Sequence, residues 1–476
     1  MTADSLYARL LAGSPDSAPR ALAARYAPII LFDRREPFLP LVAGYTVFDA
    51  DARSPSFPRD VLLRAPDRPP AQLVIEYAIW WDWDIQHLYE LEHVWVAVDP
   101  AGQVIDAEAS WHGGFQSMRH NSSIRLEGDH VVLYSEPGKH AFAPDAAWFA
   151  ARRARHPRGV TDALAGLGGL LVTPLFTGVI ARTPLADTLA RTYLARRAFT
   201  PSWNFDQRFA FDSAQLVPWA ALRDWVPQRI AWWVARLARE LAPSDYRPLR
   251  IGHRGAAAHA ADNSLAGIDA AARLGADAVE IDVQRTRDGI AVATHDLALP
   301  TADGSVRLIA ESTLAELRAL PGGATLATLD AVIARCQANR LGLYLELKAG
   351  AAIPLMLDSL RQHGFDEVIV GSFRPDWLAD VHAAAPDLPT SALFGAPSID
   401  ACALASAAGA AYVHPCWESR GPRPDVLLTE AWVARIRAAG LGIISWHEER
   451  PDVIMGLRRR GIDAICSDRP ELLGEQ

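Results

Sequence analysis

Ile251-Gly252-His253-Arg254-Gly255 is the stretch that decides the fold of the C-terminal half, because a short apolar run ends there in glycine, histidine and arginine. Three later fragments also place polar groups at or just past the end of an apolar run: Glu280-Ile281-Asp282, His295-Asp296 and Glu346-Leu347-Lys348. Such runs predict buried strands. If these strands are neighbours, their ends aim two histidines, three carboxylates and two cations at one point.

Strand-like and helix-like runs alternate beyond the proline-bracketed linker candidate at residues 242–248. The expected strands are 249–252, 279–283, 343–347, 368–371, 391–394, 412–414, 442–446 and 464–467, and the expected helices include 264–274, 353–363, 377–384, 430–439 and 451–460. This alternation predicts a (β/α)8 TIM barrel over residues 248–476, with the active site at the carboxyl ends of the strands. An additional strand at 290–294 should form a hairpin with the second barrel strand.

The converging residues suit attack on a phosphodiester, an anion that repels nucleophiles and has a poor leaving group. Glu280 and Asp282 lie two apart on one strand and so share a face, and Glu346 comes from the next strand. Three converging carboxylates without compensation would be costly, which indicates a hard divalent cation such as Ca²⁺ or Mg²⁺, with Mn²⁺ as a further candidate.

The basic residues complete this interpretation. Arg254 and Lys348 are expected to bind phosphate oxygens, and His253 and His295 to form an acid/base pair, because imidazole titrates near neutral pH. Each residue alone also has a plain structural explanation: His253 as a strand-end histidine, Glu346 with Lys348 as an ion pair. Their joint clustering at successive strand ends favours the functional interpretation.

Residues 248–476 contain a series of short motifs in a fixed order. They are His253-Arg254-Gly255, Asp262-Asn263-Ser264, residues 275–283, Thr286-x-Asp288-Gly289, His295-Asp296, Glu346-x-Lys348, Ser372-Phe373, Trp446 and Ser467-Asp468-x-Pro470. In these motifs the region resembles the glycerophosphodiester phosphodiesterase family. The resemblance implies hydrolysis to an alcohol and sn-glycerol 3-phosphate with Ca²⁺ or Mg²⁺. By position it gives Glu280, Asp282 and Glu346 as metal ligands and His253 and His295 as acid/base. Trp446 would form an apolar wall for the glycerol or alcohol moiety.

The chain departs from this family pattern at three places. The family usually has Glu where Asp262 stands and Pro where Ala327 stands. After the late Trp446 it usually has Thr-x-Asn, where this chain has His447-Glu448-Glu449. The last change bears on headgroup specificity.

Residues 1–142 are predicted to form an antiparallel β-sandwich, which makes the whole chain α/β plus all-β. Short β-rich runs occur at 26–32, 73–81, 93–98, 103–110 and 130–134, with turn signals between them. At 476 residues the chain is also too long for one typical domain.

His87, Glu90 and Glu92 form a second candidate metal site in this β region. Glu90 and Glu92 share a strand face, and a bend after His87 would bring its imidazole alongside them. The alternative is a polar edge strand with solvated charges. The region resembles the vacuolar-protein-sorting 62-like family in Tyr26-Ala27-Pro28, the His87 to Val94 run, Trp111-His112-Gly113-Gly114 and residues 134–141. The His-x-x-acid-x-Glu spacing is more remotely similar to the metal signature of necrosis- and ethylene-inducing-like proteins, which usually carry Asp at position 90 and Trp at position 91.

Residues 143–247 are predicted to form a helical connecting region rich in Arg and Trp. Residues 148–240 contain thirteen Arg, no Lys and six acidic residues, and six of the fifteen Trp. Such a composition suits peripheral membrane contact through residues 148–240. The alternative is a helical layer between two domains. Residues 163–181 carry no charge, but their glycines and Pro174 favour a buried hairpin or an interfacial loop over a membrane span.

The formal net charge of −9 argues against nucleic-acid binding. The four cysteines, at 336, 402, 416 and 466, are predicted to be small core residues in a reducing compartment. The first residues lack the basic and apolar regions of a secretory signal, so a cytoplasmic location is expected, with the membrane periphery as the alternative.

The leading hypothesis is a metal-dependent phosphodiesterase acting on glycerophosphodiesters or on a lysophospholipid-like substrate. Two alternatives stay open. One is a phospholipase D-like transferase that cyclises its substrate, and the other is a membrane-associated binding or sorting protein with a vestigial barrel.

Overall fold

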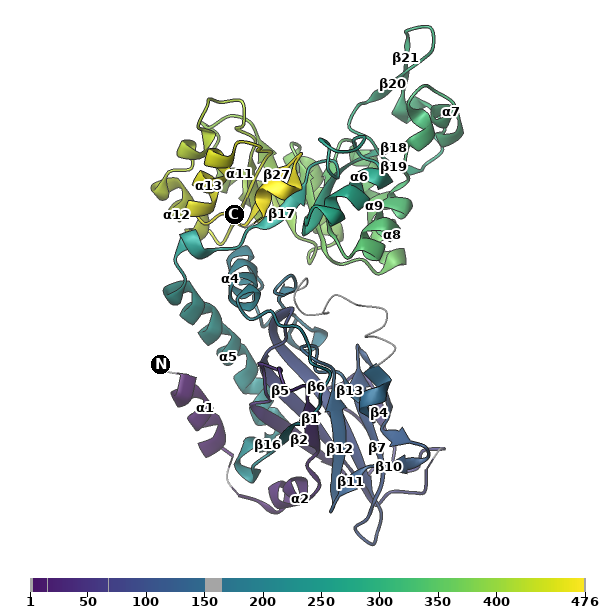
Figure 1. Cartoon of the computed structure of the whole chain (residues 1–476), viewed down its shortest axis with the longest axis vertical. Helices are drawn as coiled ribbons and strands as arrows, with labels where there is room; N and C mark the ends of the chain where they lie inside the picture. Colours follow the sequence, from purple (N-terminus) through teal and green to yellow (C-terminus); the bar gives the residue numbers. More distant parts are fainter. Residues whose placement is uncertain (1–2, 15, 67, 150–164, 475–476) are drawn as a thin grey trace. The chain divides into compact units, whose positions relative to one another are not determined.

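The computed structural model describes residues 3–14, 16–66, 68–149 and 165–474, which fold into two compact units (Figure 1). Unit 1 comprises Met1–Arg182 and Leu189–Glu240, and unit 2 comprises Thr183–Thr188 and Leu241–Gln476. Each unit has its own sheets and its own core.

Eight parallel strands form the barrel of unit 2 (Figure 1). Pairing runs in the order β17-β27-β26-β25-β24-β23-β22-β18, and β17 also pairs with β18, which closes the ring. The strands are β17 (Leu249–Gly252), β18 (Ala278–Arg285), β22 (Gly342–Leu347), β23 (Val368–Ser372), β24 (Thr390–Phe394), β25 (Tyr412–Pro415), β26 (Gly442–Ser445) and β27 (Ala464–Ser467). The predicted (β/α)8 barrel is therefore confirmed, as is the hairpin of β18 with β19 (Ala291–Ala293).

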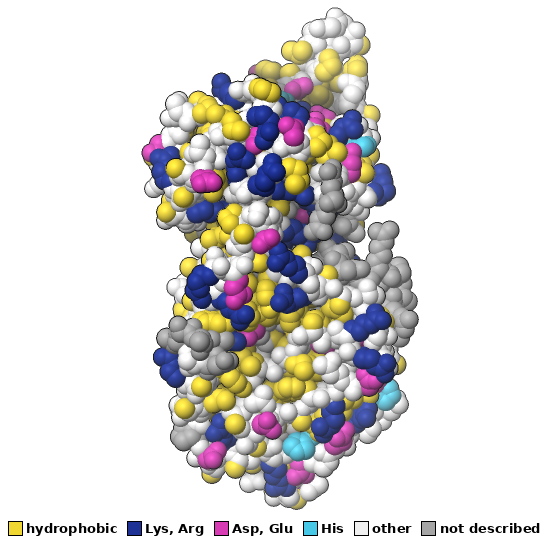
Figure 2. Space-filling view, turned by 60° about the vertical axis from the view of Figure 1, so that its left-hand side comes forward, with side chains coloured by type: hydrophobic (Ala, Val, Ile, Leu, Met, Phe, Trp, Pro, Cys, Tyr) yellow, Lys and Arg dark blue, Asp and Glu magenta, His cyan; other side chains and the backbone are white. Residues whose placement is uncertain are grey.

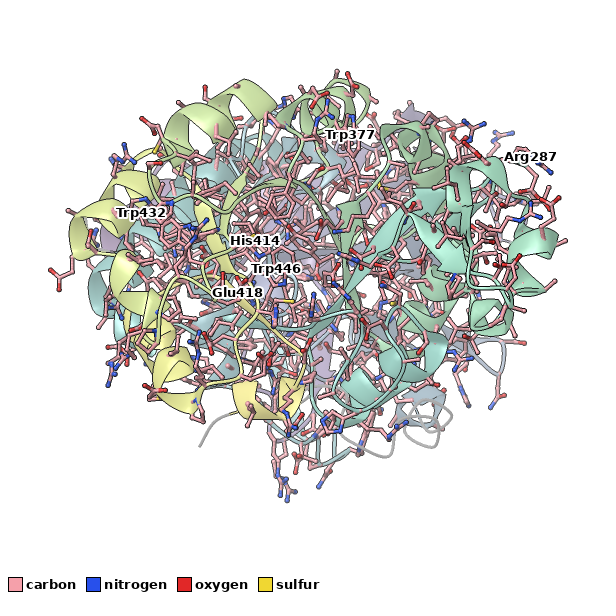
Figure 3. All side chains as sticks on the ribbon, turned by 90° about the horizontal axis from the view of Figure 1, so that it is seen from above. Arg287, Trp377, His414, Glu418, Trp432 and Trp446 are labelled. Carbon is pink, nitrogen blue, oxygen red and sulfur yellow. The ribbon has the colours of Figure 1, made fainter. Side chains whose placement is uncertain are left out.

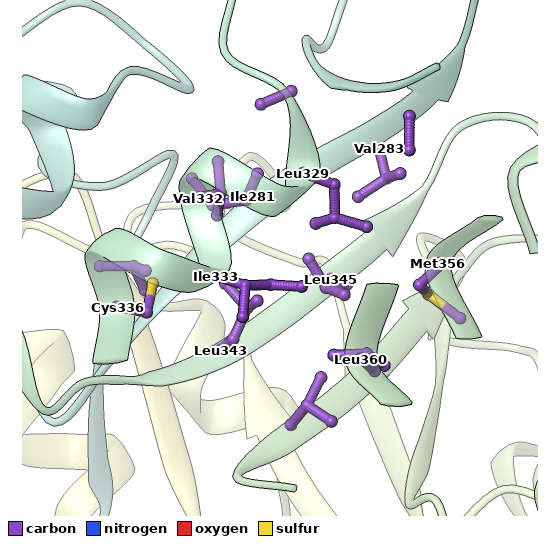
Figure 4. Packing of buried hydrophobic residues seen from close by; sticks show 14 of the residues in the cluster. Ile281, Val283, Leu329, Val332, Ile333, Cys336, Leu343, Leu345, Met356 and Leu360 are labelled. Atoms are coloured by element: carbon purple, nitrogen blue, oxygen red, sulfur yellow. The ribbon is translucent and has the colours of Figure 1, made fainter. Parts of the chain in front are cut away.

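Helices alternate with these strands: α6 (Leu265–Arg273), α8 (Leu329–Asn339), α9 (Ile353–His363), α10 (Pro375–Ala384), α11 (Ala401–Ala408), α12 (Glu430–Ala438) and α13 (Pro451–Arg459). Ser264, Thr328 and Thr429 cap α6, α8 and α12 with their hydroxyl oxygens. Buried apolar side chains of β18 and β22 pack against α8 and α9, as Ile281, Leu345, Ile333 and Leu360 illustrate (Figure 4). Cys336 belongs to this core, as predicted.

An excursion separates β19 from α8. It contains the hairpin of β20 (Ala298–Pro300) with β21 (Val306–Leu308), followed by the short helix α7 (Leu314–Arg318). The excursion begins directly after His295-Asp296, which is one of the fragments of the predicted site. It therefore starts at the same end of the barrel as that site.

Unit 1 contains two larger sheets. One has the order β16-β2-β5-β6-β7-β8, with β14 on β6, and the other has the order β11-β12-β1-β15, with β13 on β12. Their main strands are β1 (Ile29–Phe32), β2 (Val42–Phe48), β5 (Leu73–Trp83), β6 (His87–Val98), β7 (Val104–Trp111), β8 (Gly114–Ser117) and β12 (His130–Ser135). The shorter strands among them are β11 (Leu126–Glu127), β13 (Phe142–Ala143), β14 (Gly169–Leu170), β15 (Gln207–Ala210) and β16 (Leu216–Pro218). Most pairs are antiparallel, but β1–β12, β16–β2 and β14–β6 are parallel, so the sheets are mixed.

The two sheets contact each other through aromatic side chains. Trp81 of β5 stacks on His140 with ring centroids 4.7 Å apart and lies 6.5 Å from Phe32 of β1 and 6.2 Å from Phe142 of β13 (Phe142–Ala143). Trp81, His140 and Phe142 are fully buried. The predicted sheet-on-sheet core of the N-terminal half is formed by these rings.

The structure differs from the prediction that residues 143–247 form a separate helical connecting region. β14 (Gly169–Leu170), β15 (Gln207–Ala210) and β16 (Leu216–Pro218) complete the sheets of unit 1, while α4 (Pro184–Ala195) and α5 (Trp219–Glu240) supply the predicted helices. The reason is that short strands whose partners lie far away in sequence give no local signal. The helix predicted at 146–155 appears as a short 3₁₀ turn, Ala146–Phe149, and its remainder lies outside the described residues.

Three Trp residues and one Arg of α5 are used for packing within unit 1, so they are not available for the predicted membrane contact. Trp219, Trp225 and Trp233 are buried, and Arg229 is buried in an ion pair with Asp82 of β5. On the face in Figure 2, basic side chains lie scattered among apolar and acidic ones. Within the described part of the chain, no helix is both long and apolar enough to cross a membrane.

Unit 1 should lose stability in mild acid because of His93. Burial lowers the pKa of His93 from 6.5 to about 3, so the unfolded chain takes up the proton first as the pH falls. The contribution of the neutral imidazole is therefore complete above pH 6.5 and lost on the way down to about pH 3, at up to about 1.4 kcal/mol per pH unit.

Urea unfolding followed by tryptophan fluorescence between pH 7 and pH 5 measures the slope of the free energy of unfolding against pH. His93→Gln should flatten this dependence, because glutamine does not titrate in this range. An unchanged slope in His93→Gln would contradict the assignment.

Candidate active site

Three carboxylates meet at the carboxyl ends of β18 and β22. Glu280 and Asp282 share a face of β18, and Asp282 lies directly opposite Glu346 in the β18–β22 register. One oxygen from each lies within 4.8 Å of the others, and the three residues are only 4%, 1% and 3% exposed. The arrangement predicted from strand periodicity is thus present.

Two cations balance this negative charge. Lys348 Nζ lies 3.1 Å from Asp282 Oδ1 and also contacts Glu346. Arg254 donates its backbone N–H to Glu280 Oε2 at 2.8 Å, and its guanidinium Nε is 3.5 Å from Asp282. Both side chains therefore lie beside the carboxylates.

The carboxylates are under electrostatic strain without a further cation. Burial, and then the charges of Asp282 and Glu346, hold the pKa of Glu280 well above its usual range. Burial also raises the pKa of Glu346, against the opposing effect of Lys348. Glu280 Oε1 is buried and has no hydrogen-bond partner among the described residues. These three residues fit a hard divalent cation, which prefers oxygen ligands.

His253 follows β17 and is held by its neighbours. Its Nδ1 lies 2.6 Å from Asp468 Oδ1, and Trp446 Nε1 donates to its Nε2 at 3.3 Å. These contacts assign the neutral tautomer in which Nδ1 carries the proton. Burial lowers the pKa of His253, although Asp468 opposes the effect. The same Nε2 also lies 3.9 Å from Glu280 Oε2, so this edge of the ring borders the carboxylates.

His295 lies at the start of the excursion that follows β19. Its side chain is 39% exposed, and its Nδ1 is 2.9 Å from Asp296 Oδ1. A positive charge on this side chain would oppose, as the smallest of the effects at Glu346, the burial that raises the pKa of that carboxyl. The two predicted acid/base histidines thus differ, since one is buried and fixed and the other is accessible.

Close backbone packing shapes the loop that carries His253. A Cβ atom at Gly252 would lie 1.9 Å from the carbonyl oxygen of Gly255, and Gly255 has φ +95°. Side chains at these two positions would therefore displace the loop. Arg254, which precedes Gly255 in this loop, also has a positive φ of +50°.

Several site residues received no role from the sequence. Asn263 donates to Asp282 Oδ2 at 2.8 Å and accepts from the Asp282 backbone N–H at 2.9 Å. Asp468 orients His253. Asn263 and Asp468 both belong to motifs that carry the family resemblance, and this was the signal from which their importance could have been predicted.

His447 and Glu449 were noticed only as departures from the family pattern. The His447 ring stacks on His253 with centroids 4.6 Å apart, and its Nδ1 is 3.3 Å from Glu449 Oε1. Glu449 Oε1 in turn accepts from the Asp468 backbone N–H at 2.9 Å. His447, Glu449 and Asp468 therefore form a closed network around His253, in which Glu449 and Asp468 hold the pKa of His447 above its usual value despite its partial burial.

The second candidate cluster, in unit 1, differs from the predicted one. His87 Nε2 lies 3.7 Å from Glu90, and a positive φ of +60° at Tyr89 provides the bend after His87. Asp84 joins this pair, whereas the Glu92 carboxylate is hydrogen-bonded to Ser110. The Lys139 ammonium lies 2.9 Å from Asp84 and already supplies a positive charge there. Asp84, and not Glu92, thus has a carboxylate oxygen close to His87 and Glu90, and metal binding at this cluster stays a prediction.

The geometry of unit 2, a parallel barrel with polar groups gathered at the strand ends, is that of a (β/α)8-barrel hydrolase. Residues 253–472 match the model of the glycerophosphoryl diester phosphodiesterase family. A probable glycerophosphodiester phosphodiesterase 1 of Mycobacterium tuberculosis is 30% identical over 258 residues, which are 47% of this chain and 90% of the relative. The chain belongs to the glycerophosphodiester phosphodiesterase family through its C-terminal half.

Further similarities concern the same half. A glycerophosphodiester phosphodiesterase of Caldanaerobacter subterraneus is 26% identical over 48% of this chain and 96% of its own length. The structure of an Oleispira antarctica phosphodiesterase, in complex with the product sn-glycerol-3-phosphate, is 27% identical, covers 49% of this chain and 98% of that one, and has a TM-score of 0.43. The family match lies within unit 2, so the resemblance of residues 1–142 to the vacuolar-protein-sorting 62-like family stays a prediction.

Asn263→Gly should destabilise unit 2 by about 2–3 kcal/mol, because buried Asp282 loses a side-chain and a backbone hydrogen bond. Asn263→Ala should cost about 1 kcal/mol more, since residue 263 has φ +55°, which alanine adopts less readily than glycine. Chemical unfolding of both variants measures the difference. Equal stability of the two variants would contradict the role of backbone strain.

Proposed function

We propose that the protein is a metal-dependent phosphodiesterase that hydrolyses glycerophosphodiesters, or lysophospholipid-like diesters, to an alcohol and a phosphomonoester such as sn-glycerol 3-phosphate. The observation that carries the proposal is the buried group of Glu280, Asp282 and Glu346, with an unsatisfied oxygen on Glu280, beside a fixed and neutral His253. Membership of the family supports the reaction class.

Glu280, Asp282 and Glu346 would hold one divalent cation, Ca²⁺ or Mg²⁺, with Mn²⁺ as a third candidate. When bound, the cation neutralises charge on the nonbridging phosphate oxygens and so lowers the barrier to attack. Asn263 fixes Asp282 through two hydrogen bonds, which keeps the ligand from rotating away. Supporting groups of this kind normally tune metal affinity.

Arg254 and Lys348 are proposed to bind the remaining phosphate charge. The Arg254 guanidinium is held by Asp262 at 2.8 Å, and Lys348 is held by Asp282. A guanidinium can donate two parallel hydrogen bonds to phosphate, whereas an ammonium acts as a point charge. Together they orient the diester so that its ester oxygens face the histidines.

His253 and His295 are proposed as the acid/base pair. His253 presents Nε2 to the site because Asp468 holds Nδ1, in the way that a carboxylate orients the histidine of other hydrolases. His295 is accessible to solvent, which suits a group that exchanges protons with bulk water. Positioned proton transfer of this kind contributes about 10²–10⁴-fold to a rate.

His253→Ala and His295→Ala should each lower kcat/KM for glycerophosphocholine by at least about 10²-fold, because proton transfer at one side of phosphorus is lost. His259→Ala, a half-exposed histidine paired with Glu471, is the matched control and should keep activity. Thermal unfolding shows whether each variant is folded. Undiminished turnover in a folded His253→Ala protein would refute the assignment.

Phosphorus NMR of the products separates hydrolysis from cyclisation, since a transferase would release a cyclic phosphate instead of the monoester. A folded wild type that turns over neither glycerophosphodiesters nor lysolipids, yet floats with anionic vesicles, would favour the binding-protein alternative.

Removal of divalent cations by EDTA should abolish turnover and lower the melting temperature of unit 2, because Lys348 and Arg254 then balance only part of the repulsion among the three carboxylates. Addition of Ca²⁺, Mg²⁺ or Mn²⁺ should restore the turnover and the melting temperature. The ion that restores them at the lowest concentration is the preferred one. In Glu280→Gln the cation-dependent rise in melting temperature should shrink. Full activity after exhaustive chelation would overturn the metal requirement.

A further inference from the structure

The segment His447-Glu448-Glu449, which departs from the family pattern, has no role in the mechanism proposed above. It follows β26 and Trp446, and Trp446 lies near the centre of unit 2 in the view down onto the barrel (Figure 3). The backbone N–H of Glu448 donates to the carbonyl oxygen of Cys466 at 3.0 Å, which fixes the segment to β27. The Glu448 side chain is used in an ion pair of its own, so the two residues left to consider are His447 and Glu449.

The His253 ring is held at its edges by hydrogen bonds. Its Nδ1 lies 2.6 Å from Asp468 Oδ1, and the Trp446 indole N–H donates to its Nε2 at 3.3 Å. These contacts limit how far the two nitrogens move, but they leave the ring free to tilt about the line between them. The terminal torsion of a histidine side chain is broad and does not fix the ring plane either. A contact on the face of the ring is needed for that.

His447 supplies this face contact. Its ring is stacked on the His253 ring with centroids 4.6 Å apart and an angle of 9° between the two planes. The Trp446 ring, in contrast, meets the His253 ring at 63°. Of these two aromatic neighbours, only His447 lies flat against His253.

Glu449 fixes His447 in this position. Its Oε1 lies 3.3 Å from His447 Nδ1, and it also accepts from the Asp468 backbone N–H at 2.9 Å and from the Ser467 hydroxyl at 3.2 Å. One carboxylate oxygen therefore joins the residue on the face of His253 to the residue at its edge. Displacement of Glu449 would loosen both supports.

We infer that His447 and Glu449 are positioning residues for His253: the His447 ring fixes the plane of the imidazole, and Glu449 holds His447 and Asp468 together. The inference rests on the proposed function, in which His253 transfers a proton. Misplacement of such a group by about 1 Å can lower a rate about 10²-fold. The family pattern, with Thr at position 447 and Asn at position 449, offers no ring and no carboxylate, so this support distinguishes the chain from that pattern.

Steady-state hydrolysis of glycerophosphocholine by the full chain, with the cation that best restores turnover, tests the inference. His447→Ala should lower kcat about 10- to 100-fold and change KM by less than about 2-fold, because proton transfer is impaired and substrate binding is not. His447→Phe keeps a ring for the stack and should be more active than His447→Ala. Glu449→Gln keeps an acceptor oxygen and should be more active than Glu449→Ala.

A double variant shows whether His447 acts through His253. In the His253→Ala background there is no ring to position, so His447→Ala should cause no further loss of kcat. Two residues that act independently would instead give losses that multiply.

His259→Ala is the matched control. The side chains of His259 and its partner Glu471 are 35% and 33% exposed, close to the 28% and 32% of His447 and Glu449. This pair is not part of the network around His253, so its loss should leave kcat unchanged. Thermal unfolding shows whether each variant is folded.

If His447→Ala does not fold, His447→Asn replaces it in the comparison with His447→Phe. Asparagine keeps a donor for Glu449 but has no ring, so His447→Phe should be the more active of the two.

The possible results separate the inference from the proposed function. Four results would each overturn the inference: a wild-type kcat in folded His447→Ala, a rise in KM in place of the fall in kcat, His447→Phe no more active than the variant without a ring, or a further loss in the His253→Ala background. The proposed function survives all four as long as His253→Ala is impaired. If folded His253→Ala keeps full turnover, the role proposed for His253 fails, and the inference fails with it.

Discussion

The mutual repulsion of Glu280, Asp282 and Glu346 is the constraint on which the rest of unit 2 depends. Each carboxylate is fixed to a barrel strand, so the group cannot relax by turning away. Lys348 and Arg254 provide the balancing charge, and Asn263 holds Asp282 in place. The repulsion among the carboxylates would be relieved by a cation, and the basic side chains beside them would attract an anion. Binding of a phosphodiester together with a cation would use both properties.

The closed barrel was predictable because each of its strands is a short apolar run with a local signal, and helical patterns separate these runs along the sequence. The meeting of Glu280, Asp282 and Glu346 was predictable for the same reason, since strand periodicity and strand order decide which carboxylates lie close together. The network around His253 was not. Asp468 lies 215 positions away from His253, and only closure of β27 onto β17 brings the two together.

Unit 1 shows where local pattern fails. The strands β5 and β6 were predicted from their composition, and the bend at Tyr89 brings His87 to Glu90 as expected. Spacing alone could not reveal that Ser110 of the neighbouring strand binds Glu92, or that Asp84 and Lys139 approach from other segments. The buried Trp and Arg of α5 have the composition of a membrane-facing helix but serve packing, because composition does not report which neighbour covers a face.

The pairing of β15 with β1 and of β16 with β2 has a consequence for biosynthesis. Residues 29–32 and 42–48 leave the ribosome early, yet strands that complete their sheets are supplied by residues 207–210 and 216–218. Until then, each early strand has an open edge that another nascent chain could occupy. Unit 1 therefore cannot mature segment by segment, and its yield in a cell depends on how well these edges are shielded while most of its length is still being made.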